Sequence, residues 1–244
     1  FGLWFEPEMI SPDSDLYREH PDWAIHIDER EGVQSRNQMV LDLSRDEVCE
    51  YVINAVSDIL ANANIEYVKW DMNRQLTDMP RLGYNHEYTL GYYKIMSAIT
   101  EKFPNILFEG CSAGGGRFDA GVLAYMPQIW TSDNSDAIAR LKMQYSTSMC
   151  YPVYSISSHV TASPNHQCGR DTSLKTRADV AYCGTFGYEL DVTKMSDEEF
   201  EEIKAQIKFE KRIQDLMCNG DLYRLINPYE TNYCFDFSVS RNIG

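Results

Sequence analysis

Residues that could do chemistry follow a short apolar segment at positions 67–74, whose sequence is YVKWDMNR. If this segment is a strand, alternate side chains share one face, so Lys69, Asp71 and Asn73 should project together. A cation two positions from a carboxyl group lowers its pKa and keeps it ionised. The octapeptide therefore indicates either a nucleophilic Asp71 held ionised by Lys69 or a structural ion pair at a strand end, and both readings stay open.

A second acidic cluster, WTSDNSD at 130–136, also follows a predicted strand. If one strand of a barrel separates it from the first cluster, Asp71 and Asp133 should face each other across the barrel mouth. Two such carboxylates are the groups a glycosidase uses, one as nucleophile and one as acid/base, with separations of about 5 to 5.5 Å for retention and about 6.5 to 9.5 Å for inversion. The alternative is that Asp133 only caps the following helix.

The glycine-rich segment CSAGGGR at 111–117 invites comparison with phosphate-binding loops. It lacks the G-K-[ST] ending and the G-x-G-x-x-G spacing, so phosphate binding is only weakly indicated. Its glycines favour a close approach of the backbone to a flat ligand instead. Trp4 and Trp130, each near a strand end, could stack on the apolar face of a sugar or lie in the core.

For two further groups of polar residues we predict no catalytic role. Glu6 and Glu8 are a rival carboxylate pair, which we interpret as polar shell or structural because Pro7 ends their strand. His159 and His166 raise the possibility of a metal, but neither H-x-H nor H-E-x-x-H is present, so we predict no metal site and no cofactor.

The composition is that of a globular chain and argues against two classes of partner. Its 244 residues could form one large domain or two small ones, and 37 acidic against 22 basic residues give a net charge of -15. Nucleic acid and anionic membranes would be repelled, and no apolar run approaches the roughly 20 residues of a membrane span. The 16 tyrosines exceed what a core requires and suit stacking against a ligand.

Seven irregularly spaced cysteines without a C-x-x-C pair predict reduced thiols and a cytoplasmic location. The chain opens on FGLWF without an initiator Met, which we interpret as the interior of a longer protein. We therefore expect a fragment of a cytoplasmic protein.

Strands and helices are predicted to alternate. S-x-x-E capping-box sequences at 44–47 and 196–199 introduce helices over about 46–61 and 196–218. Alternation indicates a parallel sheet, either doubly wound or a (β/α)8 TIM barrel, and polar residues after several strands favour a barrel truncated at its N-terminus. About six of eight strands are expected in a partial catalytic domain over 1–220, with 221–244 starting a β-rich domain. The predicted strands are 1–5, 65–70, 106–109, 128–131, 153–157 and 186–190, and the other helices are 88–103, 137–149 and 172–183.

Four stretches together closely resemble the α-galactosidases of glycoside hydrolase family 36: FGLWFEPEM at 1–9, KWDMNR at 69–74, CSAGGGRFD at 111–119 and WTSDNSD at 130–136. The similarity runs from Phe1 to about Asn227. It implies a retaining α-galactosidase that acts on terminal α-1,6-linked galactose, as in melibiose and raffinose, within a (β/α)8 barrel.

The resemblance also implies roles for individual residues. Asp71 falls on the family's nucleophile, and Asp133 rather than Asp136 falls on its acid/base. The family's sugar-binding positions fall on Trp4, Arg36, Lys69, Asn73, Cys111, Gly114 and Trp130.

The chain departs from the family pattern because the acidic pair that grips the galactose hydroxyls, on an earlier strand, and the N-terminal β-domain lie outside it. Ala113 also replaces a common glycine, which should leave the path of the loop intact. The alternatives are an inactive or carbohydrate-binding fragment, a transglycosidase on the same scaffold, and a metal-dependent hydrolase using His159 and His166. A homo-oligomer is possible for the full-length protein.

Overall fold

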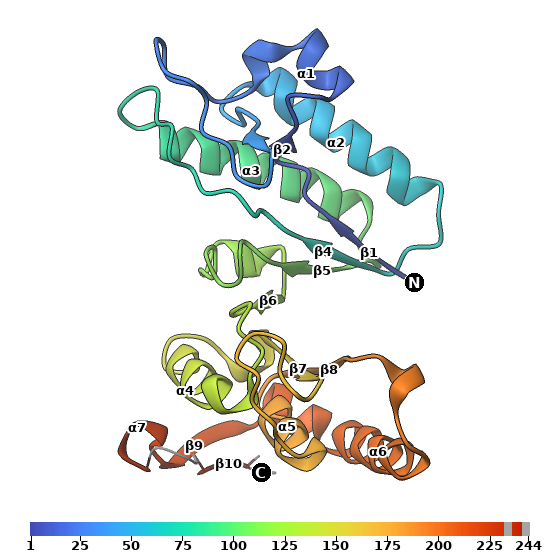
Figure 1. Cartoon of the computed structure of the whole chain (residues 1–244). Coiled ribbons are helices and arrows are strands. Elements are labelled where there is room, and N and C mark those ends of the chain that lie inside the picture. Colours follow the sequence, from blue (N-terminus) through green and yellow to red (C-terminus); the bar gives the residue numbers. More distant parts are fainter. Residues whose placement is uncertain (232–235, 241–244) are drawn as a thin grey trace. The chain divides into compact units, whose positions relative to one another are not determined.

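A computed structural model describes residues 1–231 and 236–240 of the chain (Figure 1). The chain folds into two compact units, an N-terminal unit of residues 1–127 and a C-terminal unit of residues 128–244. Among the described residues, every helix is too short or too polar to cross a membrane.

The N-terminal unit is built on three parallel strands with β4 in the middle. They are β1 (Gly2–Phe5), β4 (Tyr67–Trp70) and β5 (Leu107–Gly110). The ladder continues past the strand ends, since the Asp71 amide donates to the Phe5 carbonyl and the Cys111 amide donates to the Trp70 carbonyl, both at 2.8 Å. The carboxyl edge of this sheet therefore presents Asp71 and Cys111 side by side.

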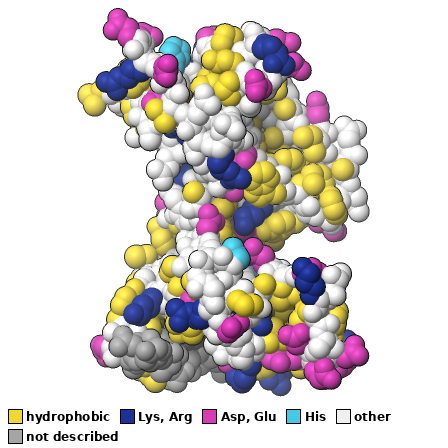
Figure 2. Space-filling model, viewed as in Figure 1, with side chains coloured by type: hydrophobic (Ala, Val, Ile, Leu, Met, Phe, Trp, Pro, Cys, Tyr) yellow, Lys and Arg dark blue, Asp and Glu magenta, His cyan; other side chains and the backbone are white. Residues whose placement is uncertain are grey.

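Helices α2 (Asp46–Ala61) and α3 (Tyr84–Lys102) pack against each other on one side of these strands (Figure 1). Smaller elements precede α2: α1 (Asp15–Glu19), a 3-10 turn at Pro21–Trp23, and the antiparallel pair β2 (Met9–Ile10) and β3 (Met39–Val40). A 3-10 turn at Val122–Ala124 follows β5. Figure 2 shows hydrophobic side chains gathered at the surface of this unit, and two exposed ones on α2 are Tyr51 and Ile59.

The predicted helix over 46–61 is confirmed, but its predicted cap is wrong. Arg45 is the N-cap residue, and it makes no side-chain cap bond. The Ser44 hydroxyl instead donates to Asp42 Oδ1 at 2.6 Å. The Ser44 hydroxyl, which the S-x-x-E pattern predicts to cap the helix, is thus hydrogen-bonded to the Asp42 carboxylate instead.

The C-terminal unit also contains three parallel strands, β6 (Gln128–Trp130), β7 (Ile156–Thr161) and β8 (Thr185–Glu189). Helices α4 (Ala137–Thr147), α5 (Leu174–Ala181) and α6 (Asp197–Asn219) alternate with them, and 3-10 turns lie at Val153–Ser155 and Val192–Lys194. Val160 of β7, Leu174 and Ala178 of α5, and Ile203 of α6 form one buried cluster. Figure 2 shows acidic side chains grouped over α6.

Two predictions in this unit have different outcomes. The capping box of α6 is confirmed, because Ser196 Oγ accepts from the Glu199 amide and Glu199 Oε2 accepts from the Ser196 amide. The strand predicted over 153–157 is displaced, since Pro152 introduces a 3-10 turn that the Ser155 amide closes by donating to the Pro152 carbonyl. The strand β7 consequently runs from 156 to 161.

After α6 the chain forms β9 (Asp221–Ile226), the short helix α7 (Pro228–Thr231) and β10 (Asp236–Ser240), with β9 and β10 antiparallel. Parts of the segment predicted to start a β-rich domain, residues 232–235 and 241–244, lie outside the described residues, and so does Cys234. The assignment of 221–244 to a separate domain stays a prediction.

Candidate active site

Asp71 directly follows β4, and hydrogen-bond donors surround its carboxylate. Its exposed fraction is 6%. Asn73 Nδ2 and Trp4 Nε1 donate to Asp71 Oδ2 at 2.7 and 3.1 Å, and the Met72 amide donates to Oδ1 at 2.8 Å. The thiol of Cys111, from the neighbouring strand, also donates to this carboxylate. The carboxylate is thus held in one orientation through both oxygens.

These donors also fix its protonation state. Burial raises the pKa of Asp71, but the hydrogen bonds from Cys111, Asn73 and Trp4 outweigh it, so the pKa lies below its ordinary value. Burial and the nearby Asp71 raise the pKa of the Cys111 thiol to about 12. At neutral pH, Asp71 is therefore an ionised acceptor and Cys111 a protonated donor.

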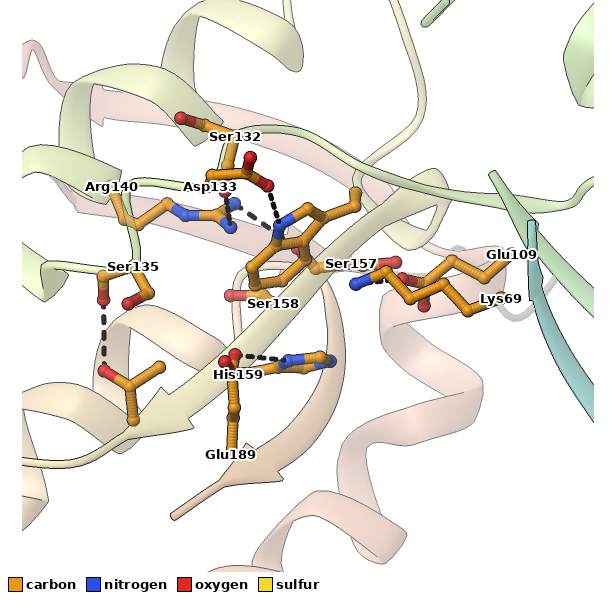
Figure 3. A network of polar contacts seen from close by, with 12 residues as sticks. Lys69, Glu109, Ser132, Asp133, Ser135, Arg140, Ser157, Ser158, His159 and Glu189 are labelled. Carbon is orange, nitrogen blue, oxygen red and sulfur yellow. Dashed lines mark hydrogen bonds and ion pairs between the residues drawn. The ribbon is translucent and has the colours of Figure 1, made fainter. Parts of the chain in front are cut away.

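Lys69 does not have the role that the sequence predicted. Its ammonium lies 3.5 Å from Oε1 of Glu109, a carboxylate with no exposed side-chain surface (Figure 3). The Tyr67 hydroxyl donates to the other oxygen of Glu109. The sequence predicted that Lys69 holds Asp71 ionised, whereas hydrogen bonds from other groups are the main causes that lower this pKa. Glu109 was missed, although parallel pairing of the two strands places it directly beside Lys69.

Asn73 links Asp71 to a further carboxylate, Glu6. Its amide nitrogen donates to Glu6 Oε1 at 2.6 Å as well as to Asp71. Arg36 Nη1 lies 3.9 Å from the same Glu6 oxygen, and its backbone has a φ of 56°. Glu6 therefore belongs to the polar shell around Asp71, which is one of the two roles expected for it.

The glycine-rich segment after β5 is a tight loop that carries Cys111. The Ser112 amide donates to the Gly114 carbonyl at 2.9 Å, and Gly114 has a φ of 85°. Ala113 also adopts a left-handed φ of 46°, which costs a residue with a Cβ atom about 1 kcal/mol. A Cβ atom at Gly116 would lie 2.6 Å from the Ser112 carbonyl oxygen, so this position requires glycine.

A buried ion pair anchors the end of this loop, and sequence reasoning missed it. Arg117 Nη1 lies 2.8 Å from both carboxylate oxygens of Glu8, which is fully buried. The Trp70 indole donates to the same carboxylate at 2.9 Å, and the Tyr88 hydroxyl also donates to it. Glu8 is thus structural, and it ties the loop to β4.

Asp133, in the C-terminal unit, has a more open setting. Its carboxylate is exposed, and Oδ1 accepts one hydrogen bond from the Trp130 indole at 3.0 Å (Figure 3). The Trp130 ring itself is buried, with the Arg140 guanidinium 4.2 Å from one ring centroid and the His159 ring centroid 4.6 Å away. A rigid indole therefore orients an accessible carboxylate.

Asp136, three residues later, has the capping role that was the alternative for Asp133. Its Oδ2 accepts from the Ala139 amide at 2.9 Å at the start of α4, and Oδ1 lies 3.2 Å from Arg170 Nε. Its exposed fraction is 2%. The structure therefore separates a buried structural carboxylate from an accessible one within the same motif.

The two histidines considered as metal ligands have different surroundings. His159 is in β7, beside Trp130 and 3.4 Å from Glu189, whereas His166 is exposed on the loop after β7. The described part of the chain contains no group of three His, Cys, Asp or Glu side chains placed to hold a metal ion. Its six described cysteines are all free.

A buried ionised carboxylate and an accessible one, each beside a tryptophan at a strand end, are the residue types of a glycoside hydrolase site. The family model described as Melibiase matches residues 1–220. The chain belongs to this family, the melibiases of glycoside hydrolase family 36.

Curated relatives extend the match. Alpha-galactosidase AgaA of Geobacillus stearothermophilus is 53% identical over 240 residues, covering 95% of this chain and 33% of the relative. The bifunctional alpha-galactosidase/sucrose kinase AgaSK of Mediterraneibacter gnavus is 50% identical, covering 98% of this chain and 26% of the relative. The chain thus spans about a third or less of the length of these relatives.

Solved structures confirm the predicted fold class. The crystal structure of a variant of the Geobacillus enzyme AgaA in complex with raffinose has a TM-score of 0.91 at 53% identity, covering 94% of this chain and 33% of that one. The Lactobacillus brevis alpha-galactosidase has a TM-score of 0.89 at 46% identity, covering 94% and 32%. The chain is an α/β (β/α)8 barrel truncated to six strands within the described residues.

Proposed function

We propose that the protein containing this chain is a retaining α-galactosidase that hydrolyses terminal α-linked galactose, mainly α-1,6-linked, from oligosaccharides of the melibiose and raffinose type. The observation that carries the proposal is the carboxylate of Asp71, which is buried, ionised and fixed by donors at a barrel strand end. Relatives named as alpha-galactosidases, and family structures with raffinose or stachyose bound, support the substrate class.

In the first step, an oxygen of Asp71 attacks the anomeric carbon of galactose. The new bond from carboxylate to carbon forms as the glycosidic carbon–oxygen bond breaks, and protonated Asp133 gives its proton to the departing oxygen. The exposure of Asp133 supports this role, because an acid/base must exchange protons with water and with the leaving group.

In the second step, a water molecule attacks the same carbon and gives a proton to Asp133. The bond to Asp71 breaks and galactose leaves with its original anomeric configuration. This mechanism requires the two carboxyl groups to lie about 5 to 5.5 Å apart.

The remaining predicted residues divide between orientation and recognition. Trp4, Asn73 and Cys111 orient the nucleophile by donating hydrogen bonds to it. Trp4 is 49% exposed, so its ring can also stack on the apolar face of galactose. We propose that Arg36, Lys69, the Gly114 backbone and Trp130 complete the sugar site.

The test uses the full-length protein and an aryl α-galactoside, with the matching α-glucoside as control. Galactose release from raffinose, followed by proton NMR, should show the α-anomer of galactose before the β-anomer. Initial formation of the β-anomer would contradict retention. Absence of release from both galactosides would refute the proposed activity.

A further inference from the structure

A pocket of about 340 Å³ lies in the N-terminal unit, between the segment after β4, helix α3 and the glycine-rich loop. This volume is at the lower end of the range for small-molecule sites. Its lining includes Met72 and Ser112, which adjoin Asp71 and Cys111 in the chain. It includes none of the residues proposed above to bind galactose, so it neighbours the nucleophile without belonging to its galactose site.

One side of the pocket is aromatic. Helix α3 contributes Tyr88, Tyr92 and Tyr93, and the rings of Tyr92 and Tyr93 have centroids 5.9 Å apart. Tyr88 and Tyr92 are almost fully buried, so of these three rings the half-buried Tyr93 is the one that a ligand could reach. Flat apolar faces of this kind suit the C–H face of a pyranose ring.

The floor of the pocket contains Arg117, which uses only some of its hydrogen-bond donors within the described part of the chain. The Arg117 guanidinium carbon lies 4.3 Å from the centroid of the Tyr92 ring, and Nη1 donates to both oxygens of Glu8. Within the described part of the chain, its hydrogen bonds to protein groups involve that nitrogen alone, and the side chain keeps 21% of its surface exposed. An arginine has five N–H donors, so donors remain for ligand hydroxyl groups.

The charges around the pocket select a neutral ligand. Glu8 compensates the Arg117 charge at the floor. The lining also contains the Asp119 carboxylate, which accepts from the Gly121 and Val122 amides, and the polar side chains of Gln75 and Thr89. This balance, in a chain of net charge -15, disfavours phosphates and carboxylates. Aromatic faces combined with uncharged hydrogen-bonding capacity are typical of carbohydrate sites.

We propose that this pocket binds a neutral pyranose unit of an oligosaccharide, in addition to the galactose at Asp71. The inference rests on the proposed glycosidase function. The pyranose is either a distal unit of the oligosaccharide being cleaved or part of a second saccharide molecule. Both sources would use the same stacking surface on Tyr93 and the same donors of Arg117.

The first experiment fills the pocket in the full-length protein. Thr89→Trp adds a large ring to the lining, and Leu90→Trp adds the same ring at the next position of α3, which is 53% exposed and outside the lining. The readout is kcat/KM for stachyose divided by kcat/KM for an aryl α-galactoside. If the pocket binds a distal sugar unit, this ratio should fall about fivefold in Thr89→Trp and stay constant in Leu90→Trp.

The second experiment identifies the source of the pyranose. Stachyose is titrated calorimetrically into the Asp71→Asn protein, with and without Thr89→Trp or Tyr93→Ala, the latter removing the stacking ring without adding bulk. Weaker binding at unchanged stoichiometry supports a distal unit of the same chain, and a drop from two bound molecules to one supports a second saccharide.

An unchanged ratio together with unchanged titrations in the pocket variants would overturn the proposal. A wild-type protein that does not cleave the aryl α-galactoside would refute the proposed activity instead. The titrations would still report on the pocket in that case, so the two failures are distinguishable.

Discussion

The surroundings of Asp71 and Asp133 differ although each carboxylate accepts from a tryptophan indole. Asp71 is 6% exposed and accepts from four groups, on both of its oxygens. Asp133 is exposed, and its carboxylate accepts from the indole of Trp130 on its own strand. The contrast is between a carboxylate that is fixed and ionised and one that is oriented but open to water.

This difference matches the different demands of nucleophilic and acid/base chemistry. A nucleophile gains from a fixed position and a lowered pKa, because it must attack as the anion from one direction. An acid/base must gain and lose a proton in every cycle, and contact with solvent permits that. Asp136 shows the third possibility, a buried carboxylate used as a helix cap.

The largest expected effect is the loss of the fixed carboxylate. Asp71→Ala should lower kcat for an aryl α-galactoside by more than about 10⁴-fold, because the covalent intermediate cannot form. Asp46→Ala is a matched control, since this exposed carboxylate on α2 pairs with the exposed Lys94. A kcat near that of the wild type would mean that the nucleophile is another residue.

Removal of the accessible carboxylate should have a smaller effect and a distinctive rescue. Asp133→Ala should lower kcat/KM for an unactivated substrate by about 10² to 10⁴-fold, and added azide should restore turnover of an activated aryl galactoside by replacing water as the second nucleophile. The measurement is the initial rate with and without azide.

Asp136→Asn is the control for that experiment. It keeps an oxygen at the cap of α4 but loses the charge beside Arg170, so stability should fall by about 1 kcal/mol or less while azide has no effect. Azide rescue in this variant and not in Asp133→Ala would reassign the acid/base to Asp136.

The rigidity around Asp71 should depend on the ion pair that anchors the Cys111 loop. Glu8→Gln leaves the largely buried Arg117 side chain without its carboxylate and should lower the free energy of unfolding by roughly 3 kcal/mol, measured by urea denaturation. The exposed pair between Glu87 and Arg81 is the control, and Glu87→Gln should cost less than about 1 kcal/mol. Equal losses would show that the buried pair contributes no more than a surface one.

The smallest effect concerns a single donor to Asp71. In the proposed mechanism ionised Asp71 is the active form, so we expect activity to fall as the pH drops through its pKa. Cys111→Ala removes a donor that favours the anion, and the pKa of Asp71 should rise, which moves the acidic limb of the kcat/KM profile to higher pH. Cys111→Ser, which keeps a donor, should reverse the shift, and Cys218→Ala on α6 should leave the limb in place. A limb that stays in place or moves to lower pH in Cys111→Ala would rule out this role.

Much of the fold could be predicted because the relevant signals are local. Helix α2 and the capping box of α6 follow from apolar spacing and from residues three positions apart. Predictions failed where a competing partner lay outside the pattern, as when Asp42 took the Ser44 hydroxyl. The predicted start of β7 was also wrong, because the 3-10 turn in which the Ser155 amide donates to the Pro152 carbonyl occupies the first residues of the predicted strand.

The sequence by itself determined the residue types at the strand ends, the alternation of strands and helices, and the family. It also separated Asp71 and Asp133 from the other acidic residues as candidates. Only the tertiary structure decided which groups contact them: Glu109 pairs with Lys69, Cys111 donates to Asp71, and Asp136 caps α4. The physical reason is that strand register and loop anchoring bring together residues tens of positions apart, and a carboxylate's pKa depends on those neighbours in space.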